Sequence, residues 1–235
     1  FTVTNPGTST VFLYREDVPT NTGSFNSGNY KGIGLIGVDP FTVTTLSGNY
    51  SLYAGGGYML YYVGSAGGGN FSTKTAGSYP LPDNTTAVFT GTLNQGDIPV
   101  KLWYNNSTAF TYTTGIANTN DQGFALVGNP YASTIDLSQV TIGGTDPGTG
   151  IYATNISTAI YMYDYAAKQY KVYDTNLHTS TGNASQYIAS GQGFFVKSTA
   201  AGATLKFHEG AKSAGQPGTG TPRLLLGLPV ADQKP

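Results

Sequence analysis

The stretch AIYMYDYAAKQYKVYD, residues 159–174, decides the fold class. Every second residue of its first run is a tyrosine: Tyr161, Tyr163 and Tyr165. The residues that alternate with them include Ile160 and Met162, and a period of two places the two sets on opposite faces of a β-strand. After a short turn, Tyr170 and Val172 share a face of a second run. The stretch therefore predicts a tyrosine-rich β-hairpin.

The rest of the chain follows the same pattern. It contains 33 Gly, 18 Tyr and 11 Phe, with only 10% charged residues, a composition that suits strands and turns better than amphipathic helices. Strand-like runs separated by Gly, Asn, Ser and Pro lie at 10–14, 58–63, 87–92, 100–104, 109–113, 123–127, 159–165, 169–173, 193–197, 204–207 and 223–228. The one helical turn that we expect is near 134–139, with Ser133 as its cap. We predict an all-β protein, an antiparallel β-sandwich of the jelly-roll or immunoglobulin-like type.

Three pieces of sequence recur in the same order and indicate a duplication. VFLYRE (11–16) resembles AIYMYD (159–164), GGGYMLYYVG (55–64) resembles GQGFFVKST (191–199), and TAVFTGTL (86–93) resembles ATLKFHEG (203–210). LIGVDPFTVT (35–44) is a looser echo of LVGNPYASTI and leaves another alignment open. We expect two related β-sandwich halves, at 1–118 and 119–228, and a tail at 229–235. The first half would begin within a repeat.

The charge pattern argues against two classes of partner. The net charge is -1 and the 11 Lys and Arg are scattered, so no basic stripe predicts nucleic-acid binding. No apolar run approaches the ~18 residues of a membrane-spanning helix, so we expect no membrane insertion. The absence of cysteine does not decide the compartment, but low charge with abundant Thr, Asn, Gly and Tyr is typical of bacterial extracellular proteins. Because the chain starts at Phe1 and not at Met, we expect a mature or excised piece.

The stretch LVGNPYASTID, residues 126–136, predicts a structural corner and not a ligand loop. Gly128 permits a sharp reversal, and Pro130 fixes the turn while it holds the preceding residue extended. Tyr131 can then fold back over the core. The residues to which we assign a structural role are Gly128, Asn129, Pro130, Tyr131, Gly191 and Gly193.

Taken in order, several segments carry a resemblance to a known kind of module. GFALVGNPYASTIDLS, IYMYDYAAKQYKVY, IASGQGFFVKST and ATLKFHEGAKSAG, followed by TPRLLLGL, resemble a module of large secreted Bacteroidota surface proteins. Such modules stand just upstream of a C-terminal type IX secretion sorting domain. The resemblance covers 84–228, and 10–65 more loosely. It implies export to the cell surface, a β-sandwich and neighbouring domains in a long adhesin-like protein, and it brings no catalytic residues.

The chemistry-bearing residues do not predict an enzyme. His178 and His208 have no metal-ligand pattern around them, so we expect isolated surface or turn residues. The chain has no G-x-S-x-G nucleophile elbow, although a Ser-His-Asp triad assembled in space stays open. Most of the 12 Asp and Glu residues lie in turn-like contexts.

Two kinds of ligand site remain. NTNDQG (118–123) offers the calcium-ligand candidates Asn118, Asn120 and Asp121, with an Asx turn as the alternative. We expect no other cofactor. The candidates for stacking on a sugar ring are Trp103, Tyr161, Tyr163 and Tyr170, with core packing as the alternative. Trp103 is the best of them if the face opposite Val100 and Leu102 is exposed.

We therefore expect a non-catalytic, extracellular structural or adhesive module of a bacterial cell-surface protein. One alternative is a carbohydrate-binding module that uses exposed aromatic rings on a polysaccharide. A second is a filament subunit, in which the apolar stretch RLLLGLPV (223–230) pairs with a sheet edge of a like subunit.

Overall fold

The structure, a computed structural model, describes residues 53–60, 92–104, 123–164 and 167–217. It also describes the backbone of four short strands, β1 (Thr2–Val3), β2 (Val11–Leu13), β3 (Lys31–Gly32) and β4 (Tyr50–Ser51). Besides strands, this part contains two single-turn 3-10 helices, η4 (Leu137–Gln139) and η5 (Glu209–Ala211). The predicted all-β class is confirmed. Within these ranges no helix has the length and apolar character that crossing a bilayer requires.

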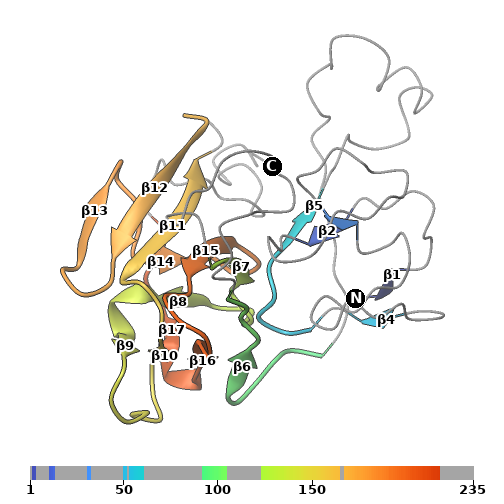
Figure 1. The fold of residues 1–235 in the computed structure, drawn as a ribbon, viewed down its shortest axis with the longest axis horizontal. Helices are drawn as coiled ribbons and strands as arrows, with labels where there is room; N and C mark the ends of the chain where they lie inside the picture. Colours follow the sequence, from blue (N-terminus) through green and yellow to red (C-terminus); the bar gives the residue numbers. More distant parts are fainter. Residues whose placement is uncertain are drawn as a thin grey trace, which may run out of the picture.

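Two sheets form the body of the fold (Figure 1). The four-stranded sheet has the order β6 (Ile98–Val100), β16 (Thr204–Phe207), β10 (Ile151–Thr154), β9 (Val140–Ile142). The five-stranded sheet has the order β13 (Thr179–Thr181), β12 (Gln169–Asp174), β11 (Ala159–Asp164), β15 (Gly193–Lys197), β7 (Phe124–Gly128). All neighbours are antiparallel except β9 and β10. A third, short sheet has the order β14 (Tyr187–Ile188), β8 (Thr134–Asp136), β17 (Lys212–Ser213).

The core lies between the two larger sheets and follows from alternation along the strands. In β15, Phe194 and Val196 are buried while the residues on either side of them are not. In β10, Ile151 and Ala153 are the buried pair, and both sets line the same narrow apolar gap between the sheets. Burying each large apolar side chain contributes about 1.5–3 kcal/mol, so this layer is the main source of stability. The sandwich prediction agrees with this architecture.

The glycine stretch at 55–57 packs against both larger sheets. Gly55 lies against Val100 of β6, where an added Cβ would stand 2.6 Å from a Val100 methyl group. Gly57 donates its N–H to Leu126 O of β7 at 3.0 Å. The chain then enters β5 (Tyr58–Leu60), which pairs antiparallel with β2, as β15 pairs with β11. These are the strands that the repeat matches. The predicted boundary at 118 and the tail at 229–235 lie outside the described residues.

Two local predictions need correction. The run 100–104 was expected to be a strand, but β6 ends at Val100, so alternation stops there and Trp103 points into the core. The helical turn at 137–139 forms, but its cap is Asp136 and not Ser133. The Asp136 carboxylate accepts a hydrogen bond from Ser138 N at 2.9 Å. The Ser133 hydroxyl instead donates to Thr134 O.

Candidate functional site

The outer face of the five-stranded sheet carries an aromatic surface. The register of the strands arranges its side chains in three rows that cross the sheet. The first row is Phe124, Lys197, Ala159, Asp174 and Thr179; the second is Leu126, Phe195, Tyr161, Val172 and Thr181; the third is Gly128, Gly193, Tyr163 and Tyr170. We call the rings of Phe124, Tyr161, Tyr163, Tyr170 and Phe195 the aromatic face.

The rings of the aromatic face touch edge to face. Tyr163 and Tyr170 are cross-strand partners, with centroids 5.2 Å apart and planes at 64°. Tyr170 also contacts Phe195, at 5.8 Å and 81°, and Phe124 contacts Tyr161, at 5.3 Å and 69°. Such T-shaped contacts are a favoured geometry for aromatic pairs. The outermost rings remain open to solvent, since Tyr163 is 42% exposed and Tyr170 54%.

Of the four sugar-stacking candidates, three lie on this face and one does not. Tyr163 and Tyr170 are exposed, and Tyr161 is half-buried beside them. Trp103 is only 7% exposed and belongs to the hydrophobic core, so it is not available to a ligand. Among the described residues its indole N–H has no hydrogen-bond partner. Phe124 and Phe195 were missed, although their alternation with buried residues in β7 and β15 is visible in the sequence.

The corner at residues 128–131 meets the Gly-Gln-Gly turn at 191–193. Asn129 donates its side-chain N–H groups to Ser133 O at 2.8 Å and to two carbonyls just before this turn, Ile188 O and Ala189 O, both at 3.1 Å. Its Oδ1 accepts from Tyr131 N at 3.0 Å, and its backbone N–H donates to Gln192 O. The two sequence motifs therefore form one interlocked unit.

Tyr131 completes this unit. The ring is almost fully buried, and the hydroxyl donates toward Gly96 O at 2.7 Å and Phe207 O at 3.1 Å. Burial first, and then the nearby carboxylates Glu209 and Asp97, raise the pKa of the Tyr131 hydroxyl to about 12. The hydroxyl is therefore a hydrogen-bond donor at any physiological pH. Pro130 is buried beside it, and Gly191 turns the chain with φ of 71°.

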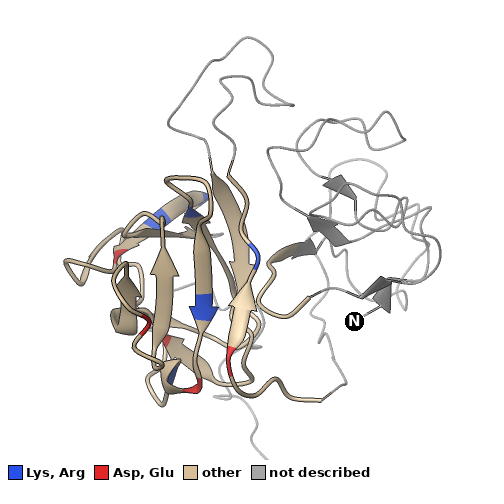
Figure 2. Cartoon of the chain, turned by 60° about the horizontal axis from the view of Figure 1, so that its bottom comes forward, with Lys and Arg blue, Asp and Glu red and all other residues tan. Residues whose placement is uncertain are grey.

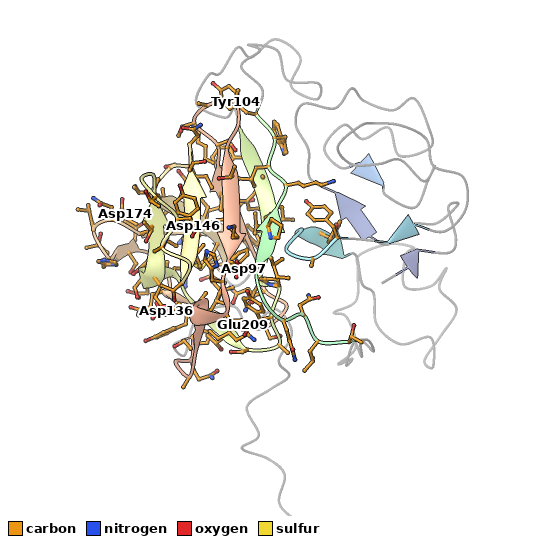
Figure 3. The ribbon with its side chains drawn as sticks, turned by 90° about the horizontal axis from the view of Figure 1, so that it is seen from below. Asp97, Tyr104, Asp136, Asp146, Asp174 and Glu209 are labelled. Carbon is orange, nitrogen blue, oxygen red and sulfur yellow. The ribbon has the colours of Figure 1, made fainter. Side chains whose placement is uncertain are left out.

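A histidine held between two carboxylates forms a second polar cluster, directly after the end of β16. Figure 3 labels the two carboxylates, Asp97 and Asp146. His208 is 2% exposed, with Nδ1 2.8 Å from Asp97 Oδ1 and Nε2 2.8 Å from Asp146 Oδ1. Both ring nitrogens therefore have a carboxylate partner. Asp146 Oδ2 accepts from Lys206 Nζ at 2.6 Å. The expectation that His208 is an isolated surface or turn residue is therefore wrong.

The histidine cluster joins segments and does not resemble a catalytic centre. Its ring nitrogens both face carboxylates, so neither is available to take a proton from a nucleophile. The hydrogen bond from Lys206, and then that from the Gly148 N–H, lower the pKa of Asp146 to about 2. Asp146 is therefore ionised and bound in place. His178, by contrast, lies in an exposed turn, with Nδ1 3.3 Å from the Tyr173 hydroxyl.

The described part of the chain contains no group of three His, Cys, Asp or Glu side chains that could hold a metal ion. The calcium candidates Asn118, Asn120 and Asp121 lie outside the described residues. The segment 223–230 that was expected to pair with a sheet edge also lies outside them.

A family model described as Domain of unknown function (DUF8693) matches residues 44–218 of the chain. The match runs across the predicted boundary at 118 and includes both the corner at 128–131 and the aromatic face. No curated protein and no solved structure matches the chain.

Proposed function

The chain belongs to the family described as Domain of unknown function (DUF8693), and we propose that it is a non-catalytic structural and adhesive module of a bacterial cell-surface protein. It holds neighbouring domains apart on a rigid sandwich and contacts its target through the aromatic face. The extracellular location rests on the low charge and on the resemblance to secreted Bacteroidota surface modules.

One observation carries the adhesive part of the proposal: the two outer faces of the sandwich differ. The five-stranded sheet turns a cluster of aromatic rings to solvent. The four-stranded sheet presents polar groups, such as the hydroxyls of Thr154 and Thr204, which lie 2.7 Å apart, and Lys206. Exposed apolar or aromatic patches on one side of a folded domain mark contact surfaces. The aromatic face therefore is the side that meets the target.

The rigidity of the module supports the structural part. Side chains connect segments far apart in the chain, as Tyr131 does with Gly96 and His208 does with Asp97. Such bonds hold loops at the ends of the sandwich, where a neighbouring domain would attach. Such connections between distant segments oppose local opening, because each one ties a buried side chain to another part of the chain.

The test measures the fraction of beads, coated with the purified chain, that stay attached to a target surface under flow. Wild-type beads should be retained on at least one target surface, such as intact bacterial cells or an extracellular polysaccharide layer. Retention should fall sharply for the double variant Tyr163→Ser, Tyr170→Ser. The matched control is Tyr152→Ser, which removes a tyrosine from the outer face of the four-stranded sheet. Equal retention of the double variant and the wild type would refute the adhesive role.

The location has its own test. Antibody raised against the purified chain should label intact, unpermeabilised cells of the source bacterium. Labelling only after permeabilisation would contradict a place at the cell surface.

A further inference from the structure

We propose that the aromatic face binds a single, uncharged polysaccharide chain through Tyr163 and Tyr170. This inference rests on the adhesive function above and names its ligand class.

Charge excludes the acidic and basic ligands. The second and third rows of the outer face contain no charged residue, and the two charges of the first row, Lys197 and Asp174, lie at one end of the face. Asp174 already accepts hydrogen bonds from Asn176 N, Leu177 N and the Thr158 hydroxyl. Lys197 lies over the Phe124 ring at 5.4 Å. Within the three rows, an ionic ligand would find no partner charge beside the exposed tyrosines, and only Lys168 of the hairpin turn adjoins them, so a neutral ligand fits best.

The charged residues of the neighbouring strands do not change this balance. Lys171 of β12 pairs with Asp164 of β11 at 2.6 Å, and both side chains are buried on the opposite side of the sheet. Figure 2 shows the charged residues of the described part as isolated bands separated by long uncharged stretches. The exposed Lys168 lies in the hairpin turn two residues before Tyr170 and is a charge that adjoins these otherwise neutral rows.

Hydrogen-bonding groups surround the rings. Within the described part, the hydroxyls of Tyr161 and Tyr163 have no hydrogen-bond partner. Strand β13, which pairs with β12 on the side away from β11, is short, fully exposed and composed of hydroxyl residues, Thr179–Thr181. A hydroxyl both donates and accepts, which matches the hydroxyl groups of a sugar. An apolar peptide would leave these groups unpaired, which makes a sugar the better occupant.

Ring geometry selects the physical form of the polysaccharide. The planes of Tyr163 and Tyr170 meet at 64°, and those of Tyr170 and Phe195 at 81°. Rings that are not coplanar cannot lie flat on the surface of a polysaccharide crystal. They form an angled cradle instead, in which the apolar face of one sugar ring packs on one tyrosine while its edge meets the other. Gly193, which the register places next to Tyr163, adds no side chain to the cradle. The surface therefore suits a soluble, flexible chain and not crystalline cellulose.

The experiment measures binding of the full chain to defined polysaccharides by titration calorimetry and by affinity gel electrophoresis. The probes are soluble uncharged polysaccharides (mannan, galactan, arabinoxylan, mixed-linkage β-glucan), the charged alginate and heparin, and insoluble cellulose. We expect at least one uncharged soluble chain to bind, with an affinity that does not change as salt rises from about 0.05 to 0.5 M, because no ion pair contributes. Alginate, heparin and cellulose should not bind.

The variants locate the site. Tyr170→Ala should weaken binding about tenfold, a loss that corresponds to about 1.4 kcal/mol. Tyr170→Phe keeps the ring and should retain most of the affinity, whereas Tyr152→Ala on the other outer face should leave it unchanged. Circular dichroism and the melting temperature verify that each variant is folded. Binding that Tyr170→Ala and Tyr163→Ala leave intact would place the site elsewhere and overturn the inference.

Two further outcomes separate this inference from the adhesive function. If no uncharged polysaccharide binds but bead retention still depends on Tyr163 and Tyr170, the glycan is wrong and the adhesive face stands. If retention is also independent of both tyrosines, the adhesive function fails as well. Sedimentation at high concentration completes the test: a dimer lost in the Tyr163, Tyr170 double variant would mean that a second copy occupies the face, and would overturn the inference.

Discussion

Replacing Asn129 by alanine should unfold the interlocked corner more than any exposed substitution near it. Its side chain is buried and makes contacts with four backbone groups that lie up to 60 residues away. Alanine removes both donors and the acceptor, and leaves the carbonyls of Ile188 and Ala189 and the N–H of Tyr131 without this partner.

The magnitude follows from counting hydrogens. The Asn129 amide has two N–H groups shared among three carbonyls, and one oxygen that accepts from Tyr131 N. That makes three hydrogen bonds, each with a net value of about 1 kcal/mol, while each buried group left unpaired costs about 1–3 kcal/mol. Partial rehydration at the corner lowers the upper limit. We expect a loss of about 3–5 kcal/mol in the free energy of unfolding, or about 10 °C in the melting temperature.

Equilibrium unfolding in urea, followed by tyrosine fluorescence and circular dichroism, measures this loss as a lower midpoint at unchanged slope. Asn129→Asp should cost at least as much, because it places an anionic oxygen against three carbonyls. The matched control is Asn94→Ala, which removes the single, partly buried bond of an exposed residue to Pro130 O at the same corner and should cost below about 1 kcal/mol. Equal midpoints for Asn129→Ala and Asn94→Ala would refute the reasoning.

Three other predictions concern the histidine cluster and the close packing at Gly57. His208→Gln leaves one of two carboxylates without a donor and should cost about 2–4 kcal/mol in urea unfolding; an unchanged midpoint would contradict the cluster. The pKa of Asp146 is about 2, below its ordinary 3.8. The stabilising effect of the ionised carboxylate is therefore complete above pH 3.8 and disappears as the pH falls through about 2. Asp146→Asn should flatten the dependence of the free energy of unfolding on pH in this acid range. A carbon-13 titration of the Asp146 carboxyl should show the low midpoint. Gly57→Ala places a Cβ 2.5 Å from Leu126 Cγ and should lower the melting temperature several times more than the control Gly144→Ala. At Gly144 an added Cβ meets no atom within 4 Å, so the cost of about 1 kcal/mol comes from its φ of 69° alone. Similar shifts for both variants would argue against the close packing at Gly57.

Long alternating runs were predictable, and short strands were not. β7, β11, β12, β15 and β16 lie within about a residue of the predicted runs, because four to six alternating residues define both faces of a strand. β8, β14 and β17 have only two or three residues, too few for a period to appear, and they form only because the corner at 128–131 brings their partners together. β9 pairs parallel with β10, a contact that local sequence does not specify.

The direction of each face could not be read from the pattern. Tyr161 and Tyr173 lie on paired strands and belong to similar alternations, yet Tyr173 is buried and Tyr161 is on the outer face. Both faces carry bulky residues, so alternation separates two sets without saying which of them meets the other sheet. The same ambiguity explains Trp103, for which the end of β6 at Val100 decides burial.

The sequence by itself determined the all-β class, the strands of the Tyr-rich hairpin and the structural nature of the Gly-Asn-Pro-Tyr corner, because each depends on residues within a few positions of one another. Only the tertiary structure decided which rings face solvent and which groups pair. His208 meets Asp97 across 111 residues, and no local pattern encodes that distance. The aromatic face likewise exists because strand order places β15 between β7 and β11. Its rings come from separate stretches of sequence and become one surface only when the sheet is assembled.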